Sequence, residues 1–511
     1  MIAQALLYIL AIVVLLVAFV YFKLVRRQKQ LYDAFRVQGI KGEPFVPLVG
    51  QILELSKQRD NDTSVVYFQE LAKKHGDVFL FGFGPLTRLM CNDPDLLADV
   101  LSRTNSVNYE KPLDFKLVFE TLMGSHSLLV AEGNEHERAR RMINPAFHHV
   151  NLKSMISIIT DQTAKAIASL TTNKEHESKP VDLQIEFNAL TLSIIVSSAF
   201  GADFETNTNA KEIFCGILAE LLDAIEYRSM RMINQIPFLS KLPFWRKNLI
   251  DSGVRTIGAY VDQIIADRRQ GRSASLCCGA DLLDLLLSAV DDDGQTLTDQ
   301  EIKEQSLTFV LAGSETTATL MVWILYVLMT HEDVQQACRE EVDRILPNGI
   351  QPTDEHLSQL MVCEAVINET LRLYPAAPFF VRQAVHDHVI GTERQLHIQT
   401  GSTIVINTNV LHRRDDLWPR PNQFDYTRWM RDPKTGLKPK LSHPYAYLPF
   451  AAGPRNCIGQ NFALLEAKLI LAMLVQRCTF QMTSGQKIAP DVKITMRAKY
   501  GLWAKVSQRQ I

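Results

Sequence analysis

One cysteine stands apart from the others because of the loop that contains it. The segment "FAAGPRNCIGQ" places Cys457 between two glycines, close to Arg455 and directly before an apolar helical run. The chain has eight cysteines, of which only Cys277 and Cys278 are close in sequence, and no CxxC spacing occurs. Neither a disulfide framework nor a zinc site is therefore indicated. We interpret the other seven as small buried side chains of a protein in a reducing compartment, which leaves Cys457 as the candidate for chemistry.

A polar patch inside an apolar helix is the second candidate. The stretch "TDQEIKEQSLTFVLAGSETTATLMVWILYVLMTHEDVQ" predicts a helix from about Asp299 to Thr330, with Thr298 and Glu301 as a capping box. Its middle, residues 312–317, contains a glycine, an acid and two threonines, which lower helix propensity or are costly to bury. Apolar residues on both sides argue against a solvent-exposed face, so we expect this patch to have a use.

A charged pair on a second helix is the third candidate. In "MVCEAVINETLRLYPAAPFFVRQ", Glu369 and Arg372 are three residues apart and share a helix face, and Tyr374-Pro375 ends the helix. An exposed ion pair would contribute little. The neighbouring residues are aliphatic, so we expect the pair to be buried, with every donor of the arginine satisfied.

Helical apolar spacing over most of the chain indicates the elements that carry these motifs. Short runs rich in β-branched or aromatic residues predict strands at 77–90, 386–398, 402–406 and 493–502. Hydrophobic residues make up 47% and charged residues 22%, as in an ordinary globular protein. We predict one large, mainly α domain with small β-sheets (α+β). The net charge of −2 argues against nucleic acid as a partner, because any basic patch must be local.

An uncharged apolar segment near the N-terminus has the length of a membrane span. Residues 5–22, "ALLYILAIVVLLVAFVYF", would extend roughly 27 Å as a helix. A cleaved signal peptide would need a preceding basic region and a small-residue cleavage site, and the sequence has neither. We predict a transmembrane signal anchor at 1–22, a basic hinge linker at 23–43 and a folded body at 44–511. The basic cluster behind the span predicts a cytosolic body.

Taken in order, the motifs resemble those of the cytochrome P450 family of haem-thiolate monooxygenases. The 312–317 segment "AGSETT" resembles the family's oxygen-activating helix, and Glu369 with Arg372 resembles its ExxR helix. Arg428 matches the arginine that joins that pair. The family's cysteine loop, FxxGxRxCxG, is matched at every fixed position, by Phe450, Gly453, Arg455, Cys457 and Gly459. The resemblance spans roughly residue 44 to the C-terminus and implies the cytochrome P450 fold.

The resemblance implies a haem b cofactor with Cys457 as the axial thiolate ligand and metal-binding residue. A thiolate donates electron density to iron and favours O–O cleavage, and glycines allow the backbone to approach the porphyrin. Further haem contacts are implied for Phe450, Gly453, Gly459, Ala312, Arg140, Arg455, Arg382 and His136. Arg455 and Arg382 would pair with propionates. His136 stands where the family usually has tryptophan, and a surface histidine is the alternative.

The resemblance assigns catalysis to Glu315 and Thr316. Cleavage of dioxygen needs two protons, and an acid–alcohol pair can relay them through a held water, while the adjacent glycine would open a groove for oxygen. Glu369, Arg372 and Arg428 are expected to be structural, bracing the cysteine-loop side of the haem.

The N-terminal anchor, the "SETT" motif and the long C-terminal half resemble microsomal members, most of all the fatty-acid and sterol hydroxylase branch. Ala312 stands where ω-hydroxylases often carry a haem-linked glutamate, so we expect non-covalent haem and disfavour a strict ω-hydroxylase. A lipophilic substrate is expected at apolar residues. The expected contacts, for which ordinary core packing is the alternative, are the loop 105–128, Phe309, Ala377, Phe379 and Phe380.

Electrons must come from a separate protein, since the chain contains no GxGxxG motif. The resemblance implies NADPH–cytochrome P450 reductase, with cytochrome b5 as an additional candidate, and the endoplasmic reticulum membrane as location. An apolar segment at 233–247 is expected to touch that membrane, with packing on the body as the alternative. Basic residues that could contact an acidic partner, or be plain surface charges, are Arg138, Arg141, Lys438 and Lys440.

These expectations define a monooxygenase that inserts one oxygen atom from O2 into a lipophilic substrate. Two alternatives stay open. One is a haem-thiolate isomerase or dehydratase acting on peroxides, which needs no proton relay. The other is a haem-binding sensor without turnover.

Overall fold

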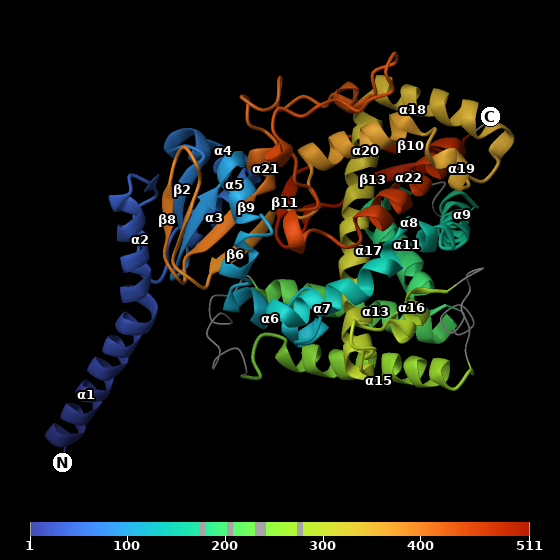
Figure 1. Ribbon diagram of the computed structural model, residues 1–511. Helices are drawn as coiled ribbons and strands as arrows, with labels where there is room; N and C mark the ends of the chain where they lie inside the picture. The colour runs from blue at the N-terminus through green and yellow to red at the C-terminus, as the bar shows by residue number, and fades with distance from the viewer. Residues whose placement is uncertain (1, 173–178, 202–207, 230–241, 273–279, 510–511) are drawn as a thin grey trace.

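The computed structural model describes residues 2–172, 179–201, 208–229, 242–272 and 280–509. Helices dominate, and the strands gather in small sheets (Figure 1), as predicted. The long predicted helix is α17, Asp299–Thr330, with the Thr298–Glu301 capping box in place. It runs through the centre of the body, and most of its side chains are buried. Because other elements enclose most of the helix, its sequence is apolar on nearly every face.

Other helices surround α17. The helix α11, Leu183–Phe200, packs along it, and α20, Met361–Leu373, and α22, Gln460–Arg477, contact it as well. The remaining helices are α3 Ile52–Asp60, α4 Ser64–His75, α5 Pro94–Val100, α6 Leu113–Met123, α7 Gly133–Ile143, α8 His149–Lys153, α9 Ile156–Thr172, α13 Thr208–Ser229, α15 Lys247–Arg269, α16 Leu282–Ser288, α18 Glu332–Ile345, α19 Asp354–Leu357 and α21 Thr408–Leu411.

The largest sheet has six strands in the order β1-β2-β3-β9-β6-β4. The strands β2 and β3 pair antiparallel, and β9 pairs parallel with β3 and antiparallel with β6. All four predicted β-rich runs contain strands. The bounds are β1 Lys41–Gly42, β2 Val78–Phe83, β3 Leu86–Cys91, β4 Tyr109–Glu110, β6 Phe379–Ala384 and β9 Thr403–Asn407.

Three smaller sheets complete the fold. The first, in the order β10-β13-β5, joins the C-terminus to the start of α11, and two hairpins form the others. These strands are β5 Val181–Asp182, β7 His388–Ile390, β8 Leu396–Ile398, β10 Cys478–Met482, β11 Pro490–Val492, β12 Met496–Ala498 and β13 Trp503–Gln508. The hairpin β11–β12 contacts α4 and α17.

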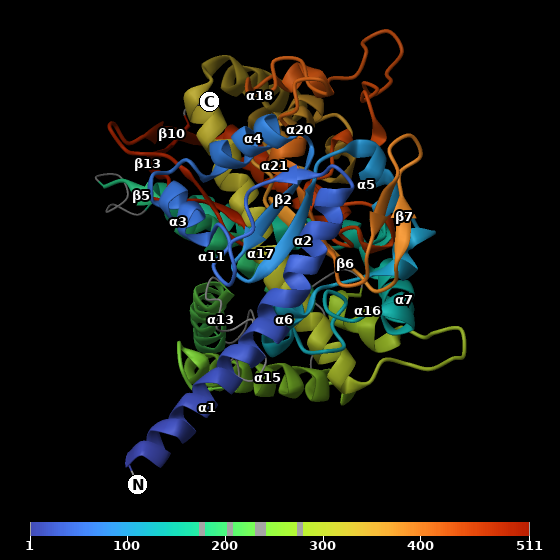
Figure 2. The same cartoon turned by 90° about the vertical axis from the view of Figure 1, so that its left-hand side faces the viewer.

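The N-terminal segment is a continuous helical rod that projects from the body (Figures 1 and 2). It consists of α1, Ile2–Val20, a π-helical turn at Tyr21–Arg26 and α2, Arg27–Val37. Residues 23–37 are thus helical where a hinge linker was predicted, and Leu31 and Phe35 of α2 are buried in the body. Apolar side chains placed four residues apart bury one face of a helix, so the folded body begins before residue 44.

Two helices in the described part of the chain are long and apolar enough to cross a membrane, α11 and α17, and both are mostly buried inside the body. They are therefore core helices. Along α1 and the turn after it, by contrast, large apolar side chains are exposed, namely Leu7, Tyr8, Ile9, Leu10, Ile12, Val14, Leu15, Phe19, Tyr21 and Phe22. Such a run of exposed apolar side chains needs a non-aqueous partner.

Candidate functional site

The loop around Cys457 begins with a 3₁₀ turn at Gly453–Arg455 and ends at α22. The backbone N–H of Cys457 donates to the carbonyl of Phe450 at 2.9 Å, which closes the loop. Gly453 has φ +73°, and a Cβ there would lie 1.8 Å from the carbonyl oxygen of Leu101. Glycine is required at this position, because any side chain would collide with the backbone of a neighbouring segment.

Cys457 differs from the other cysteines in its exposure. Among the five cysteines that the structure describes, it alone is exposed, and the other four are buried as predicted. Burial by the surrounding protein still raises the pKa of its thiol, while the backbone N–H of Gly459 and the charge of Arg140 lower it. The sulfur is thus accessible yet enclosed on most sides, as a metal-binding thiolate needs.

The central helix opens on the same region. Ala312 is exposed and Thr316 is half-buried in the middle of a helix most of whose side chains are buried, and they lie four residues apart on one face. Phe147 connects this helix to the cysteine loop. Its ring packs edge-on against Phe309 of α17 with centroids 5.1 Å apart, and a Cβ on Gly459 would lie 4.0 Å from it. Phe147 therefore lies between α17 and the Cys457 loop.

The predicted acid–alcohol pair is placed differently from expectation. Thr316 donates its hydroxyl to the carbonyl of Ala312 at 2.7 Å. The carboxylate of Glu315 accepts from Oγ1 of Thr495 at 2.9 Å and forms an ion pair with Arg497. No hydrogen bond within the described residues joins Glu315 to Thr316. The two side chains are neighbours in sequence but point to different partners.

The glycine of this motif also lies against a neighbouring helix. A Cβ on Gly313 would lie 3.2 Å from Cγ1 of Ile195 in α11. That separation is tighter than an ordinary van der Waals contact, so the glycine allows α11 and α17 to approach closely. Gly313 is half-buried like Thr316, and the groove for oxygen at this glycine stays a prediction.

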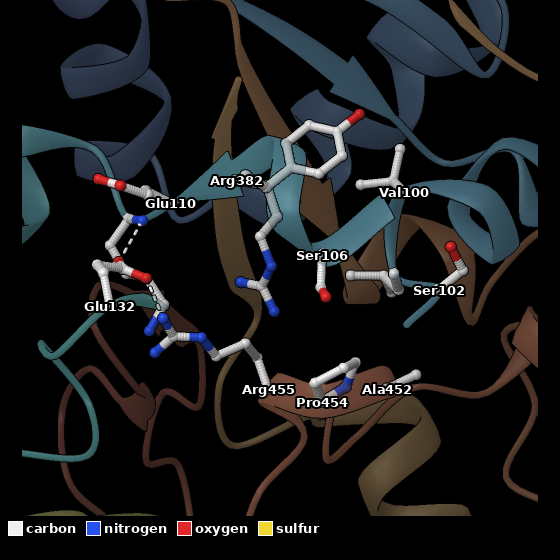
Figure 3. Close-up of a pocket in the computed structure, with 12 residues that line it drawn as sticks. Val100, Ser102, Ser106, Glu110, Glu132, Arg382, Ala452, Pro454 and Arg455 are labelled. Atoms are coloured by element: carbon white, nitrogen blue, oxygen red, sulfur yellow. Dashed lines mark hydrogen bonds and ion pairs between the residues drawn. The ribbon is translucent and has the colours of Figure 1, made fainter. Parts of the chain in front are cut away.

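Three cationic side chains converge on one cavity below the six-stranded sheet. Figure 3 shows the guanidinium groups of Arg382, from β6, and Arg455, from the cysteine loop, extending into the same space beside Glu132. Arg455 pairs with Glu132 and donates to the carbonyl of Ala131 at 2.7 Å. The third cation that lines this cavity is Lys111.

The pKa values in this cluster report an excess of positive charge. Burial, followed by the neighbouring charge of Arg455, lowers the pKa of Arg382 to about 10, and its guanidinium donates only to the carbonyl of Val381 among the described contacts. Burial and the charges of Arg382 and Arg455 hold the pKa of Lys111 well below its usual range. Burial, then Arg455 and Lys111, lowers the pKa of His136 to about 3. The two carboxylates that line the cavity, Glu132 and Glu110, do not balance these charges and that of the adjacent Lys116.

His136 is buried, so the alternative of a surface histidine is wrong. It lies on α7 four residues before Arg140, and the two side chains share a helix face. Arg140 donates to the carbonyl and to Oδ1 of Asn456, each at 2.7 Å. Arg140 therefore holds the cysteine loop at Asn456, the residue directly before Cys457.

The predicted structural cluster is assembled and fully buried. The side chains of Glu369 and Arg372 are both 0% exposed. Nε and Nη2 of Arg372 donate to the two carboxylate oxygens of Glu369 at 2.9 and 2.8 Å. Arg428 donates to Glu369 at 3.3 Å. The other donors of Arg372 reach three backbone carbonyls, those of His412, Pro421 and Gln423, at 2.7–3.1 Å. Burial with complete hydrogen bonding was predicted, and the geometry confirms it.

Several substrate-contact predictions coincide with packing positions. Phe309 is buried against Phe147, and Phe379 packs edge-on against Phe68 with centroids 5.3 Å apart. Phe380 lies under the guanidinium of Arg382 at 5.8 Å. Residues 105–128 are not a simple loop, because they contain β4 and α6. Of the apolar segment 233–247, residues 233–241 lie outside the described residues, and Phe244 is exposed.

Three of the four predicted partner-contact cations are engaged within the chain. Arg138 pairs with Asp291 at 2.7 Å, and Arg141 pairs with Asp292. Lys438 pairs with Glu364 at 2.7 Å. An acidic loop and two helices thus already balance these charges, which weakens the case for them as docking residues, whereas Lys440 is exposed.

The sequence reasoning missed Lys111, Glu132, Trp429, Arg497 and Glu466. The indole of Trp429 donates to Glu369 at 2.8 Å, one residue after the recognised Arg428, and an aromatic beside a buried acid was a usable signal. Lys111 and Arg497 belong to no motif, and only the folded chain brings them to the site.

Comparison with known proteins agrees with this geometry. The family model described as "Cytochrome P450" matches residues 40–502. The chain is 31% identical to cytokinin hydroxylase of Arabidopsis thaliana, over 93% of this chain and 92% of the relative. It is 30% identical to cytochrome P450 3A29 of Sus scrofa, over 88% and 87%. The crystal structure of the cytochrome P450DA heme domain superposes with a TM-score of 0.77 at 26% identity, covering 92% of this chain and 98% of that one.

The fold and the site define a haem-thiolate enzyme. The chain belongs to the cytochrome P450 family and is a P450 monooxygenase, with haem bound through a thiolate-ligated iron. The curated relatives carry names from several P450 subfamilies, and redox partners and small-molecule substrates are general to the family.

The residues of the cationic cavity fit this cofactor. Haem carries two propionate groups, and the buried Arg382 and the half-buried Lys111 have no carboxylate partner among the described ion pairs. Cations that are shielded from water and lack a counter-charge are costly, and an anionic ligand in their cavity would remove that cost. The accessible sulfur of Cys457, bordered by α17, supplies the ligand that the iron requires.

Proposed function

We propose that this chain is a membrane-anchored monooxygenase that inserts one oxygen atom from O2 into a lipophilic substrate, such as a fatty acid, a sterol, another lipid or a xenobiotic. Electrons come from NADPH through NADPH–cytochrome P450 reductase, with cytochrome b5 as an additional donor. The observation that carries this proposal is the accessible Ala312–Thr316 face of a mostly buried helix, joined to the Cys457 loop through Phe147. We propose that a substrate and a thiolate-bound cofactor meet there.

In this proposal Cys457 holds the haem iron, and Arg455, Arg382, Lys111 and His136 surround the propionates. Bound haem supplies the electron transfer and oxygen activation. The chain holds the loop rigid, through Gly453 against Leu101 and through Arg140 on Asn456. Ala312 carries no carboxyl group, which supports non-covalent haem. Glu369, Arg372 and Arg428 keep the structural role and touch no reacting atom.

Thr316 is the proposed proton-delivering residue. Its hydroxyl is half-buried on the accessible face and bonded to its own helix carbonyl at 2.7 Å, so it can rotate toward the site without disturbing the core. Glu315 is the proposed acid that resupplies it. A lipophilic substrate is proposed to contact apolar side chains, with Ala377 and Phe380 as candidates.

The N-terminal rod supports the proposed location. Ten large apolar side chains are exposed along α1 and the following turn, and a bilayer would cover them. The basic residues behind them, Arg26 and Arg27 among them, favour a cytosolic body. We place the protein in the endoplasmic reticulum membrane with a single span. The microsomal members among the relatives, such as cytochrome P450 3A29, support this location.

The direct test reconstitutes the full chain in lipid vesicles with reductase, NADPH and a microsomal lipid extract under ¹⁸O2. The expected result is NADPH-dependent products that carry one ¹⁸O atom. Turnover of added lipid hydroperoxides without NADPH would instead indicate the isomerase or dehydratase alternative. NADPH consumption no faster than that of reductase alone would indicate a sensor.

Replacing Thr316 with alanine is expected to uncouple electron use from product formation. Loss of the hydroxyl removes the proton donor from the accessible face, so the yield of product per NADPH should fall on the order of a hundredfold while NADPH consumption continues and hydrogen peroxide accumulates. Thr319→Ala is the matched control, because that threonine is fully buried on the same helix. Unchanged coupling in Thr316→Ala would contradict the proposed role.

A further inference from the structure

Glu315 is held by a distant part of the chain. Its Oε1 atom accepts from Oγ1 of Thr495 at 2.9 Å and from the guanidinium of Arg497. The carboxylate is 10% exposed and Arg497 is 27% exposed. Both partners lie in the β11–β12 hairpin, about 180 residues later in sequence. The acid of the proton relay is therefore docked on the C-terminal hairpin.

The hairpin is itself fixed at the residue between those two partners. The indole of Trp323, two turns after Glu315 on α17, donates to the carbonyl of Met496 at 2.7 Å. The backbone N–H of Met496 donates to the carbonyl of Ala376 at 3.0 Å, in the segment that leads to β6. The backbone that carries Arg497 therefore contacts both the central helix and the segment beside the proposed substrate region.

This arrangement keeps the acid away from the alcohol. Glu315 uses Oε1 for both hairpin donors, and Thr316 satisfies its hydroxyl with Ala312. For a proton to pass between them, the carboxyl group has to leave Arg497 and the hydroxyl has to rotate. The first movement breaks an ion pair and is the costlier of the two, since a charge-assisted contact is about twice as strong as a neutral one.

We propose that Arg497 is a positioning residue for the proton relay: with Thr495 it holds Glu315 in a storage position, and release of Glu315 from Arg497 admits the acid to Thr316. After release, the Glu315 carboxylate first takes a proton from solvent hydronium. The carboxyl group then passes that proton to Oγ1 of Thr316 while the Thr316 hydroxyl gives its own proton to the site. The carboxylate is regenerated, so one proton moves per cycle and no electron is exchanged. This inference rests on the proposed function.

The contacts of the hairpin give the release a physical trigger. A substrate that displaces the segment at Ala376 moves the hydrogen-bonded backbone of Met496, and Arg497 is the next residue. Substrate binding and release of Glu315 are then linked through one backbone position, and proton delivery is suppressed while the site holds no substrate. That link lowers wasteful consumption of NADPH.

The test is a double-mutant cycle on the full-length holoenzyme with reductase, measured as NADPH consumption without added substrate, in H2O and in D2O. Arg497→Gln is expected to raise the rate on the order of fivefold, because the ion pair that retains Glu315 is gone. Its solvent isotope effect should exceed that of the wild type, since proton transfer replaces ion-pair rupture as the slow step. Arg497→Lys, which retains the charge, should behave as the wild type.

Making the same substitution in a Glu315→Gln variant distinguishes a positioning role of Arg497 from a purely structural one. In Glu315→Gln the Arg497→Gln change should alter neither the rate nor the isotope effect, because its action passes through the carboxylate. Equal effects of Arg497→Gln in both backgrounds would overturn the proposal, as would a lowered rate in Arg497→Gln with an intact carbon monoxide spectrum. Thr495→Val, which removes one hydrogen bond and keeps the shape, should give a smaller change in the same direction.

Failure of the proposed function has a different signature. In that case the wild-type holoenzyme itself would consume no NADPH with reductase, whatever residue stands at 497. A wild type that consumes NADPH, together with additive effects of the two substitutions, would overturn the role of Arg497 alone.

Discussion

Arg372→Leu is expected to destabilise the fold by about 3–5 kcal/mol and to prevent recovery of the haem-bound protein. The substitution leaves the Glu369 carboxylate, at 0% exposure, without its two-pronged partner. It also removes the donors to three backbone carbonyls, those of His412, Pro421 and Gln423. These carbonyls belong to the segment that precedes the cysteine loop, so the loss reaches the haem side. Denaturant unfolding and the yield of haem-bound protein measure the two effects.

Arg269→Leu is the control for this prediction. Arg269 pairs with Asp299, but the two side chains are 44% and 63% exposed, and removing an exposed pair should cost no more than about 1 kcal/mol. If Arg372→Leu were as mild as this control, the buried cluster would not be the brace that the geometry indicates. Trp429 and Arg428 would then hold Glu369 well enough without the arginine.

Glu466→Gln is expected to stabilise the protein above neutral pH. Glu466 lies on α22, 1% exposed, and neither carboxyl oxygen has a hydrogen-bond partner among the described residues. Burial raises its pKa to about 8, and the nearby Thr317 hydroxyl lowers it only in part. The folded protein therefore retains a proton that the unfolded chain has already lost.

The sign of the pH dependence follows from that retained proton. Below a pH of about 4.5, the usual pKa of glutamate, both states are protonated and Glu466 contributes fully. Between that pH and about 8 the unfolded state binds fewer protons, so the free energy of unfolding falls by roughly 1.4 kcal/mol per pH unit. Glutamine cannot ionise, so the variant should lack this decline.

The measurement is denaturant unfolding of both proteins between pH 5 and pH 9. Glu364→Gln serves as a control of opposite sign. Burial would raise the pKa of Glu364, but its hydrogen bonds and charge contacts with Lys438 and Lys468 prevail and lower the pKa to about 2. That substitution should therefore cost stability throughout the range from pH 5 to pH 9, and the cost should vanish only when the measurement is extended from pH 4.5 toward pH 2. Parallel pH profiles of wild type and Glu466→Gln would contradict the buried, protonated state of Glu466.

The helix and the loop that carry chemistry were predictable because their signals are local. The bounds of α17 follow from a capping box at one end and a long apolar run. The turn at Gly453 follows from glycine, and the burial of Arg372 from its aliphatic neighbours. In each case the residues that determine the structure lie within a few positions of one another.

The positions that local patterns could not give depend on contacts between distant segments. Lys111 meets Arg382 and Arg455 only because β4, β6 and the cysteine loop converge. Arg497 pairs with Glu315 although the two residues are 182 positions apart in the sequence. The prediction that Glu315 acts together with Thr316 used only their adjacency on one helix. The partner-contact prediction for Arg138 and Arg141 had the same weakness, since sequence spacing does not show that Asp291 and Asp292 lie beside them.

The central claim is that Cys457 ligates haem iron, and the carbon monoxide difference spectrum of the reduced, membrane-expressed protein tests it most directly. The wild type should give a strongly red-shifted Soret band, because a thiolate donates electron density to the iron, and Cys457→Ser should lose that band. Cys91→Ser, at a buried cysteine of β3, should retain it. A spectrum typical of histidine ligation in the wild type, or a red-shifted band that persists in Cys457→Ser, would contradict the claim.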